Sequence, residues 1–165
     1  MRKMREIVAA VLALTGFAAG EARATDFVWP VSGRVTTTYY YRTGGTHGGI
    51  DIAGSSWSAI GAARAGYARH ITYYHYGYYY SYGKLVIVSH SSGYSTYYAH
   101  NIAYGHSGYV SRGATIGYRG STGHSTGSHC HFEIRRYGSR YYIPAYVGQY
   151  VYKGRAVPRN FPGIY

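Results

Sequence analysis

The sequence predicts a mainly β fold, a compact antiparallel β-sheet domain with long loops. Three observations carry this prediction. No segment after residue 24 sustains the 3.6-residue apolar repeat of an amphipathic helix. The 24 glycines punctuate the chain as turn residues, and the 24 tyrosines favour strands. The 165 residues, 46% of them hydrophobic, suffice for one domain with a core, which excludes a disordered polycation.

The clearest pair of strands is a predicted hairpin in the middle of the chain. Residues 84–90 (KLVIVSH) have the composition of a strand, and so do residues 94–100 (YSTYYAH). Ser91, Ser92 and Gly93 lie between them as a turn. Strands joined by so short a turn pair in an antiparallel manner.

Two further strands are predicted on either side of a long loop. Residues 114–118 (ATIGY) form a short strand, and residues 120–128 (GSTGHSTGS) have the Gly/Ser composition of a loop. Residues 129–135 (HCHFEIR) return to strand. We find no internal repeat and no interdomain linker, so residues 25–165 are predicted to be one domain.

Residues 1–24 have the pattern of a secretory signal peptide. A basic start containing Arg2, Lys3 and Arg5 precedes a short apolar run over residues 7–19. Ala22-Arg23-Ala24 then offers a small-residue cleavage site. The alternative is an uncleaved N-terminal anchor helix. We expect a secreted, periplasmic or cell-envelope protein with no transmembrane segment after signal removal.

The chain is strongly basic. Removing residues 1–24 takes away four basic and two acidic side chains, so the formal charge falls only from +12 to +10. Three acids remain: Asp26, Asp51 and Glu133. Such a charge attracts polyanions, and anionic envelope polymers are the expected partners. Nucleic acid would also suit a basic, aromatic-rich surface, but it is not the expected partner.

Tyrosine is the other unusual feature, since 24 Tyr stand beside only 4 Phe and 2 Trp. The simpler interpretation is a half-buried β surface on which Tyr replaces other residues. The alternative is a face that binds sugar or peptide through amphipathic rings.

Two groups of histidines indicate a metal site. His47 and Asp51 are separated by Gly48-Gly49-Ile50, and the glycines are expected to let the backbone turn so that both side chains converge. His129 and His131 share one face of a strand, whereas Cys130 faces the other way and is not expected to be a ligand. Two His and one Asp leave a fourth position open on Zn²⁺. The alternative is a set of surface histidines that bind no metal.

Four segments together resemble the lysostaphin-type (LytM-like) zinc endopeptidases, which cleave peptidoglycan cross-bridges. The resemblance covers residues 33–147 and implies an antiparallel β fold whose loops form a substrate groove; it leaves residues 148–165 unassigned. The matching segments are 46–53 (THGGIDIA), 95–100 (STYYAH), 120–123 (GSTG) and 127–134 (GSHCHFEI).

The resemblance also implies roles for individual residues. One Zn²⁺ per chain would be held by His47, Asp51 and His131. His100 and His129 would be catalytic, and Tyr41 would help to stabilise the reacting carbonyl. Glu133 would either orient a histidine or pair with Arg135 or Arg136.

Outside these motifs, the other histidines are expected at the surface or in loops, with His124 the best placed for a substrate contact. Tyr40, Tyr78 to Tyr80 and Tyr141 are expected in loops that flank the groove.

The function implied is a secreted zinc metalloendopeptidase that hydrolyses peptide cross-links of peptidoglycan. Its substrate would be a cross-bridge or stem peptide, with Gly–Gly and D-Ala–diaminopimelate bonds both open. Catalytically silent regulators of cell-wall hydrolases share the fold but usually lose one or more of these positions, and all five are present here. A polyanion-binding module is the remaining alternative, and it leaves the His/Asp pattern unexplained.

Overall fold

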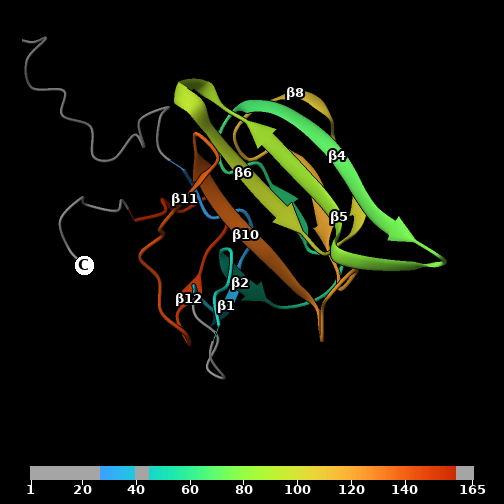
Figure 1. Cartoon of the computed structure of the whole chain (residues 1–165). Helices are drawn as coiled ribbons and strands as arrows, with labels where there is room; N and C mark the ends of the chain where they lie inside the picture. The colour runs from blue at the N-terminus through green and yellow to red at the C-terminus, as the bar shows by residue number, and fades with distance from the viewer. Residues whose placement is uncertain (1–26, 40–44, 159–165) are drawn as a thin grey trace, which may run out of the picture.

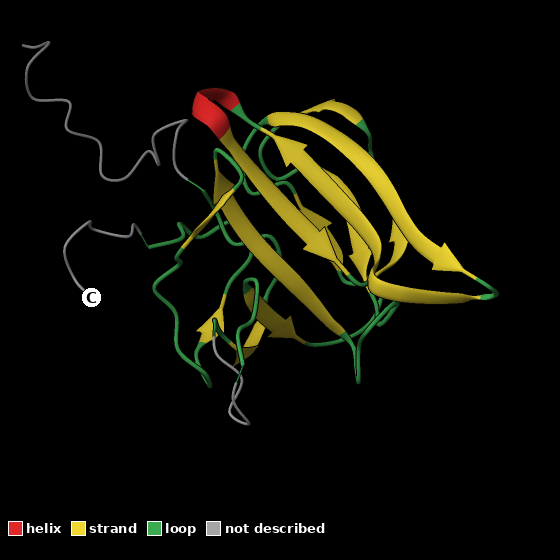
Figure 2. Cartoon of the chain, viewed as in Figure 1, coloured by secondary structure: helices red, strands yellow, loops and turns green. Residues whose placement is uncertain are grey.

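The computed structural model describes residues 27–39 and 45–158. The predicted signal peptide, Tyr40 and Tyr41 lie outside the described residues. Within them the chain is built of antiparallel strands with one short 3₁₀ turn, Ser91–Gly93, which confirms the predicted mainly β fold (Figure 2). No helix of this part is long and apolar enough to cross a membrane.

The larger sheet has the strand order β12-β1-β2-β10-β6-β5-β4-β8, and β11 pairs with β10 outside this path. Figure 1 shows β10, β6, β5 and β4 side by side as one curved layer. The strands are β1 (Gly33–Thr37), β2 (Ile50–Ala53), β4 (Gly66–His75), β5 (Tyr78–Ser89), β6 (Tyr94–Ala99), β8 (Gly108–Val110), β10 (His129–Arg136), β11 (Ser139–Tyr141) and β12 (Tyr150–Val151).

A smaller sheet of three strands has the order β3-β9-β7. These strands are β3 (Ala59–Gly61), β7 (Asn101–Tyr104) and β9 (Thr115–Arg119). The predicted short strand is therefore found as β9, and the predicted loop over residues 120–128 separates it from β10. The predicted hairpin is β5 and β6, paired antiparallel, for example Val86 with Tyr98.

The expectation that Tyr78 to Tyr80 and Tyr141 lie in loops is wrong. The first three begin β5, and Tyr141 ends β11. Here β5 starts six residues earlier than predicted and pairs with β4 to form a hairpin that extends beyond the sheet (Figure 1). Cross-strand ring contacts such as Tyr74 with Tyr79, at 4.9 Å between centroids, support it. Tyrosine rings therefore pack against one another in the β4–β5 hairpin, and several of them remain exposed.

The core lies on one face of the large sheet. Alternation along β10 sends Cys130, Phe132 and Ile134 into the main hydrophobic cluster, where each is at most 1% exposed. The residues between them face the other way. Beyond the expected family region, Val151 of β12 and Val157 also join the core. The unassigned tail is therefore part of the fold as far as residue 158.

His90 lies in the loop that follows β5, as expected for the remaining histidines, and it is half-buried there. Its Nδ1 donates to the Ala65 carbonyl at 2.9 Å, so the neutral ring accepts at Nε2 from the Thr96 hydroxyl at 2.8 Å. The chain of bonds continues to the Tyr98 hydroxyl, which accepts from Ala63 N–H. Burial lowers the pKa of His90. A proton on Nε2 would leave this buried chain with one donor too many.

Candidate metal centre

β10 and its neighbour β2 bring the predicted metal ligands together. His131 and Asp51 are direct partners in the antiparallel register of the two strands. Because side chains alternate, His129, His131 and Glu133 share the face opposite the core, where Asp51 also lies. Cys130 is fully buried in the core, as the alternation predicted, and burial raises its pKa to about 12. The thiol is therefore not placed to bind a metal.

The glycines between His47 and Asp51 serve close packing and not a left-handed turn. Neither Gly48 nor Gly49 is among the residues with positive φ. A Cβ at Gly49 would lie 2.2 Å from the Phe132 carbonyl oxygen, and one at Gly48 would lie 2.8 Å from Glu133 Oε1. Glycine is required because the segment leading into β2 crosses β10 at backbone contact distance, which corrects the expected reason.

Three donor atoms converge at this crossing. His47 Nε2 lies 3.2 Å from Asp51 Oδ1, and His131 Nδ1 lies 2.9 Å from the same oxygen. The ligand atoms of the three residues all lie within 4.8 Å of one another. His47 Nδ1 donates to the Thr38 carbonyl at 2.7 Å, which turns the lone pair of Nε2 toward the carboxylate. The lone pair of His47 Nε2 and the Asp51 carboxylate repel each other unless a cation or a proton lies between them.

Between His131 Nδ1 and the same carboxylate, a proton on the imidazole supplies the positive charge. Burial disfavours the imidazolium, but the carboxylates of Asp51 and Glu133 outweigh it and raise the pKa of His131 to about 9. Burial also opposes ionisation of Asp51, yet the neighbouring His131 and His47 imidazoles hold the pKa of its carboxyl well below the usual range. The donor set of two imidazoles and one carboxylate is one that Zn²⁺ accepts. These residues therefore fit a zinc ion.

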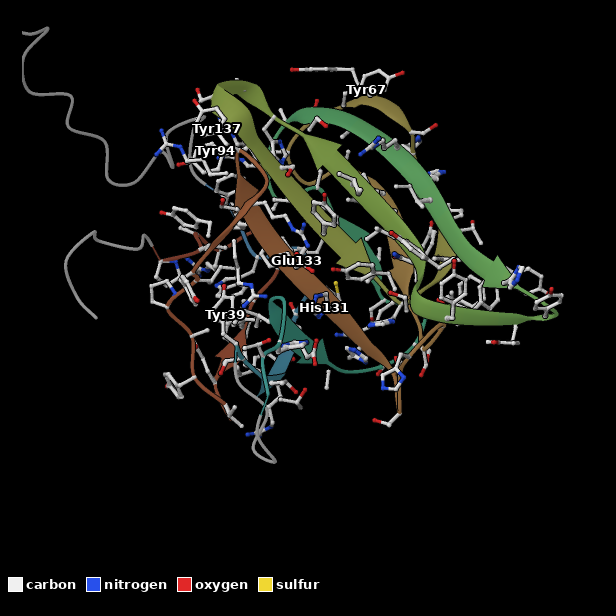
Figure 3. All side chains as sticks on the ribbon, in the orientation of Figure 1. Tyr39, Tyr67, Tyr94, His131, Glu133 and Tyr137 are labelled. Atoms are coloured by element: carbon white, nitrogen blue, oxygen red, sulfur yellow. The ribbon has the colours of Figure 1, made fainter. Side chains whose placement is uncertain are left out.

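Glu133 follows His131 by two residues on the same face of β10 and fixes its ring by a hydrogen bond (Figure 3). Its Oε1 accepts from His131 Nε2 at 2.9 Å and from the Tyr82 hydroxyl at 2.7 Å. Its Oε2 accepts from Arg135 Nε at 2.7 Å. Both interpretations of Glu133 therefore hold at once, whereas Arg136 makes no ion pair with it among the described residues. Burial opposes the charge, but bonds from His131 and Arg135 lower the pKa of Glu133 to about 2.

Tyr82 was missed by sequence reasoning. It stands in the tyrosine-rich start of β5, and nothing in the sequence separates it from its neighbours. Only the pairing of β5 with β6, and of β6 with β10, brings its hydroxyl to Glu133.

A second pair of histidines stands beside the three ligands. The His100 and His129 rings are 4.6 Å apart between centroids, and His129 Nε2 lies 3.7 Å from Asp51 Oδ1. His100 occupies a left-handed turn, φ 62°, between β6 and β7, and its Nδ1 donates to the Thr122 carbonyl at 2.7 Å. His129 Nδ1 donates to the Gly127 carbonyl at 2.8 Å. Both rings therefore keep Nε2 as the acceptor.

The electrostatic setting keeps His100 neutral. Burial, and then the neighbouring His129, lower the pKa of His100 to about 4.

These side chains line one cleft of about 730 Å³. The structure brings five of the six predicted site residues to it: His47, Asp51, His100, His129 and His131. The sixth, Tyr41, lies outside the described residues. His124 also lines the cleft from the 120–128 loop, together with Ser81, Tyr82, Ser125 and Thr126.

Comparison with known proteins agrees with this geometry. The chain is 37% identical over 109 residues to the DD-carboxypeptidase/endopeptidase Mpg of Neisseria meningitidis, covering 62% of this chain and 24% of that protein. It is 38% identical over 115 residues to the murein hydrolase activator NlpD of Escherichia coli, covering 67% of this chain and 28% of NlpD. The chain thus spans about a quarter of the length of these curated relatives.

Among solved structures, the catalytic domain of the antimicrobial peptidase lysostaphin from Staphylococcus simulans superposes with a TM-score of 0.52 at 27% identity, covering 65% of this chain and 80% of that chain. The model of peptidase family M23 matches residues 45–143, which span β2 to β11 and all five histidine and aspartate positions of the cleft. The chain belongs to peptidase family M23.

Proposed function

We propose that the protein is a zinc-dependent endopeptidase that hydrolyses peptide cross-links of peptidoglycan. The observation that carries the proposal is the pairing of a three-residue donor set with two further histidines, each bonded through Nδ1 to a backbone carbonyl, in one cleft. A metal site alone would suit a structural role. Two further imidazoles, each with one nitrogen tied to a carbonyl and the other open, are what general acid–base catalysis requires.

His47, Asp51 and His131 would hold one zinc ion per chain. When bound, zinc polarises the scissile carbonyl and makes water more acidic. The protein keeps the ligands in place through the Thr38 carbonyl, which fixes His47, and through Glu133, which fixes His131. Tyr41, which follows the described residues 27–39, is proposed to help stabilise the oxyanion.

His129 and His100 would move the protons. His129 Nε2, which faces Asp51, accepts a proton from the attacking water, since its Nδ1 is already committed to Gly127. Burial, the largest cause, lowers the pKa of His100 to about 4, so its Nε2 carries no proton before the reaction. The proton that His129 removes from the water would pass to His100, whose ring centroid lies 4.6 Å from that of His129, and from His100 to the departing amine as the peptide bond breaks. Proton transfer by such groups contributes about 10²–10⁴ in rate.

A catalytically silent regulator is the second candidate. The name of NlpD describes an activator of murein hydrolases, so family membership does not separate the two functions. The presence of all five positions in one cleft favours the enzyme, because a regulator needs neither the metal donors nor the two acceptor histidines.

The site of action is proposed to be the cell envelope, reached through the signal peptide of residues 1–24. One of the relatives is an outer membrane antigenic lipoprotein of Histophilus somni, 35% identical over 114 residues. Peptidoglycan as substrate follows from the family to which the chain belongs.

Release of muropeptides from purified peptidoglycan tests the proposal. The zinc-loaded chain should release soluble fragments, and His129→Ala should release about 10²–10⁴ times fewer while it keeps its zinc. His106→Ala, which removes an exposed histidine outside the cleft, is the matched control and should retain most turnover. A zinc-loaded, folded chain that releases nothing, yet stimulates a separate wall hydrolase, would establish the regulator instead.

A further inference from the structure

A second cleft, of about 610 Å³, lies beyond the end of β2 and shares no lining residue with the metal centre. It is bordered by the start of β1, residues 53–59, the end of β9 and the segment around β12. Three of its lining side chains are cationic: Arg34, Arg119 and Lys153. None is acidic. The cleft therefore carries a positive potential without an internal counter-charge.

Arg119 is the buried cation of this cleft, since only 3% of its surface is exposed. Its Nε donates to the Ser55 carbonyl at 3.0 Å. Its Nη1 donates to the carbonyls of Ser32 at 2.9 Å and Ile52 at 3.4 Å. Its Nη2 donates to the Ser58 hydroxyl at 2.8 Å. A guanidinium has five N–H donors, so one N–H on Nη2 has no partner among the described residues.

Among residues 27–39 and 45–158, no carboxylate balances this buried charge. The acids of the described part are Asp51 and Glu133, and both are engaged at the metal centre. Buried cations are normally paired, because desolvation of a charge is costly. Here the backbone is instead shaped around the cation, since a Cβ at Gly54 would lie 2.4 Å from Arg119 Nη2. The guanidinium is thus held in a fixed position in the lining of the cleft.

We propose that this cleft binds a phosphate group carried by a sugar or polyol. Guanidinium and ammonium groups are the usual protein partners of phosphate, and Arg119, Arg34 and Lys153 supply both kinds. A volume of about 610 Å³ is within the range of small-molecule sites, so it accommodates the organic part as well as the anion. The exposed Tyr150 and the Ser32 hydroxyl provide polar contacts for hydroxyl groups. This inference goes beyond the peptidase function and does not rest on it.

The test measures binding to the full, ¹⁵N-labelled chain by NMR. The probes are inorganic phosphate, glycerol 3-phosphate, poly(glycerol phosphate) and phosphatidylglycerol vesicles. We expect saturable shifts of the backbone amides of Gly33, Gly54 and Lys153, with glycerol 3-phosphate tighter than inorganic phosphate. Binding to the polymer but not to vesicles assigns the phosphate to an envelope polymer, and binding to vesicles through the same amides assigns it to a lipid headgroup.

Two double variants with the same net charge separate a site from diffuse attraction. Arg34→Gln with Lys153→Gln removes the two exposed cations of the cleft and should weaken glycerol 3-phosphate at least about tenfold. Arg69→Gln with Arg140→Gln removes two cations that do not line it and should have little effect. Arg119→Lys keeps the charge but loses the planar guanidinium with its paired N–H donors. This variant, if folded, should also bind glycerol 3-phosphate more weakly.

Equal loss in both double variants, or the absence of saturable shifts with every phosphate compound, overturns the proposal. Because the readout is binding, its failure would leave the muropeptide assay of the peptidase function unaffected.

Discussion

Replacing Glu133 with alanine should weaken zinc binding about 10–100-fold, because partners that orient a ligand histidine typically contribute that much. In free energy this is about 1.4–2.7 kcal/mol. The structure indicates the upper half of the range. Glu133 is 1% exposed, accepts from His131 Nε2 at 2.9 Å, and is itself held by Tyr82 and Arg135 at 2.7 Å each. Without it, no described carboxylate is left to accept a hydrogen bond from His131 Nε2.

The assay is competition for zinc with a chelator of known affinity, at constant pH, on variants whose fold is checked by circular dichroism. Glu133→Gln keeps a neutral acceptor for His131 and should lose less affinity than the alanine variant. Arg135→Gln is the control, because it leaves the bond between Glu133 and His131 intact. Since the Arg135 side chain is 29% exposed, this change should alter affinity at most a few-fold. A folded Glu133→Ala chain with wild-type zinc affinity would refute the reasoning.

Three further substitutions test a metal ligand, the buried thiol and the half-buried His90. His131→Ala should lose nearly all zinc by metal analysis, and full retention would remove it from the ligand set. Cys130→Ala should keep zinc and activity while it loses about 1–2 kcal/mol of stability in denaturant melts, since the thiol is buried in the core; loss of zinc in a folded variant would contradict its orientation. His90 has a pKa below its usual value of about 6.5, so the unfolded chain binds its proton more readily. The stabilisation from neutral His90 is complete above that pH and is lost as the pH falls through the lower pKa of the folded state. His90→Gln should make the unfolding free energy less sensitive to acid, and an unchanged acid slope would show that the buried chain of hydrogen bonds does not require the neutral ring.

Local pattern predicted most of the strands near the site, because period-two alternation and turn residues are properties of short segments. Residues 129–135 were expected as a strand with Cys130 on the face opposite His129 and His131, and this is how β10 lies. The prediction failed for the β4–β5 hairpin. Tyr78 to Tyr80 were expected in a loop although tyrosine favours strands, and their pairing with β4 places them in β5.

The close approach of the backbone at Gly49 was likewise invisible in the sequence. Two glycines in a row suggest a turn, but here they allow β10 to pass at contact distance. Such a contact depends on a strand about eighty positions away in the chain, and no local rule contains it.

The sequence by itself determined the chemistry of the metal centre. The residue types and spacings of His47, Asp51 and the two histidines of β10 predicted a metal site, since ligand chemistry is a property of side chains and alternation fixes which of them share a face. The family resemblance then implied that His131, and not His129, is the third ligand. Tertiary structure alone decided what surrounds that set. The carboxylate of Glu133 behind His131, the hydroxyl of Tyr82, and the guanidinium of Arg119 left without a counter-charge all depend on which strands become neighbours. Strand order is fixed by how the whole chain buries its apolar faces, so it is settled by long-range packing and not by any short segment of sequence.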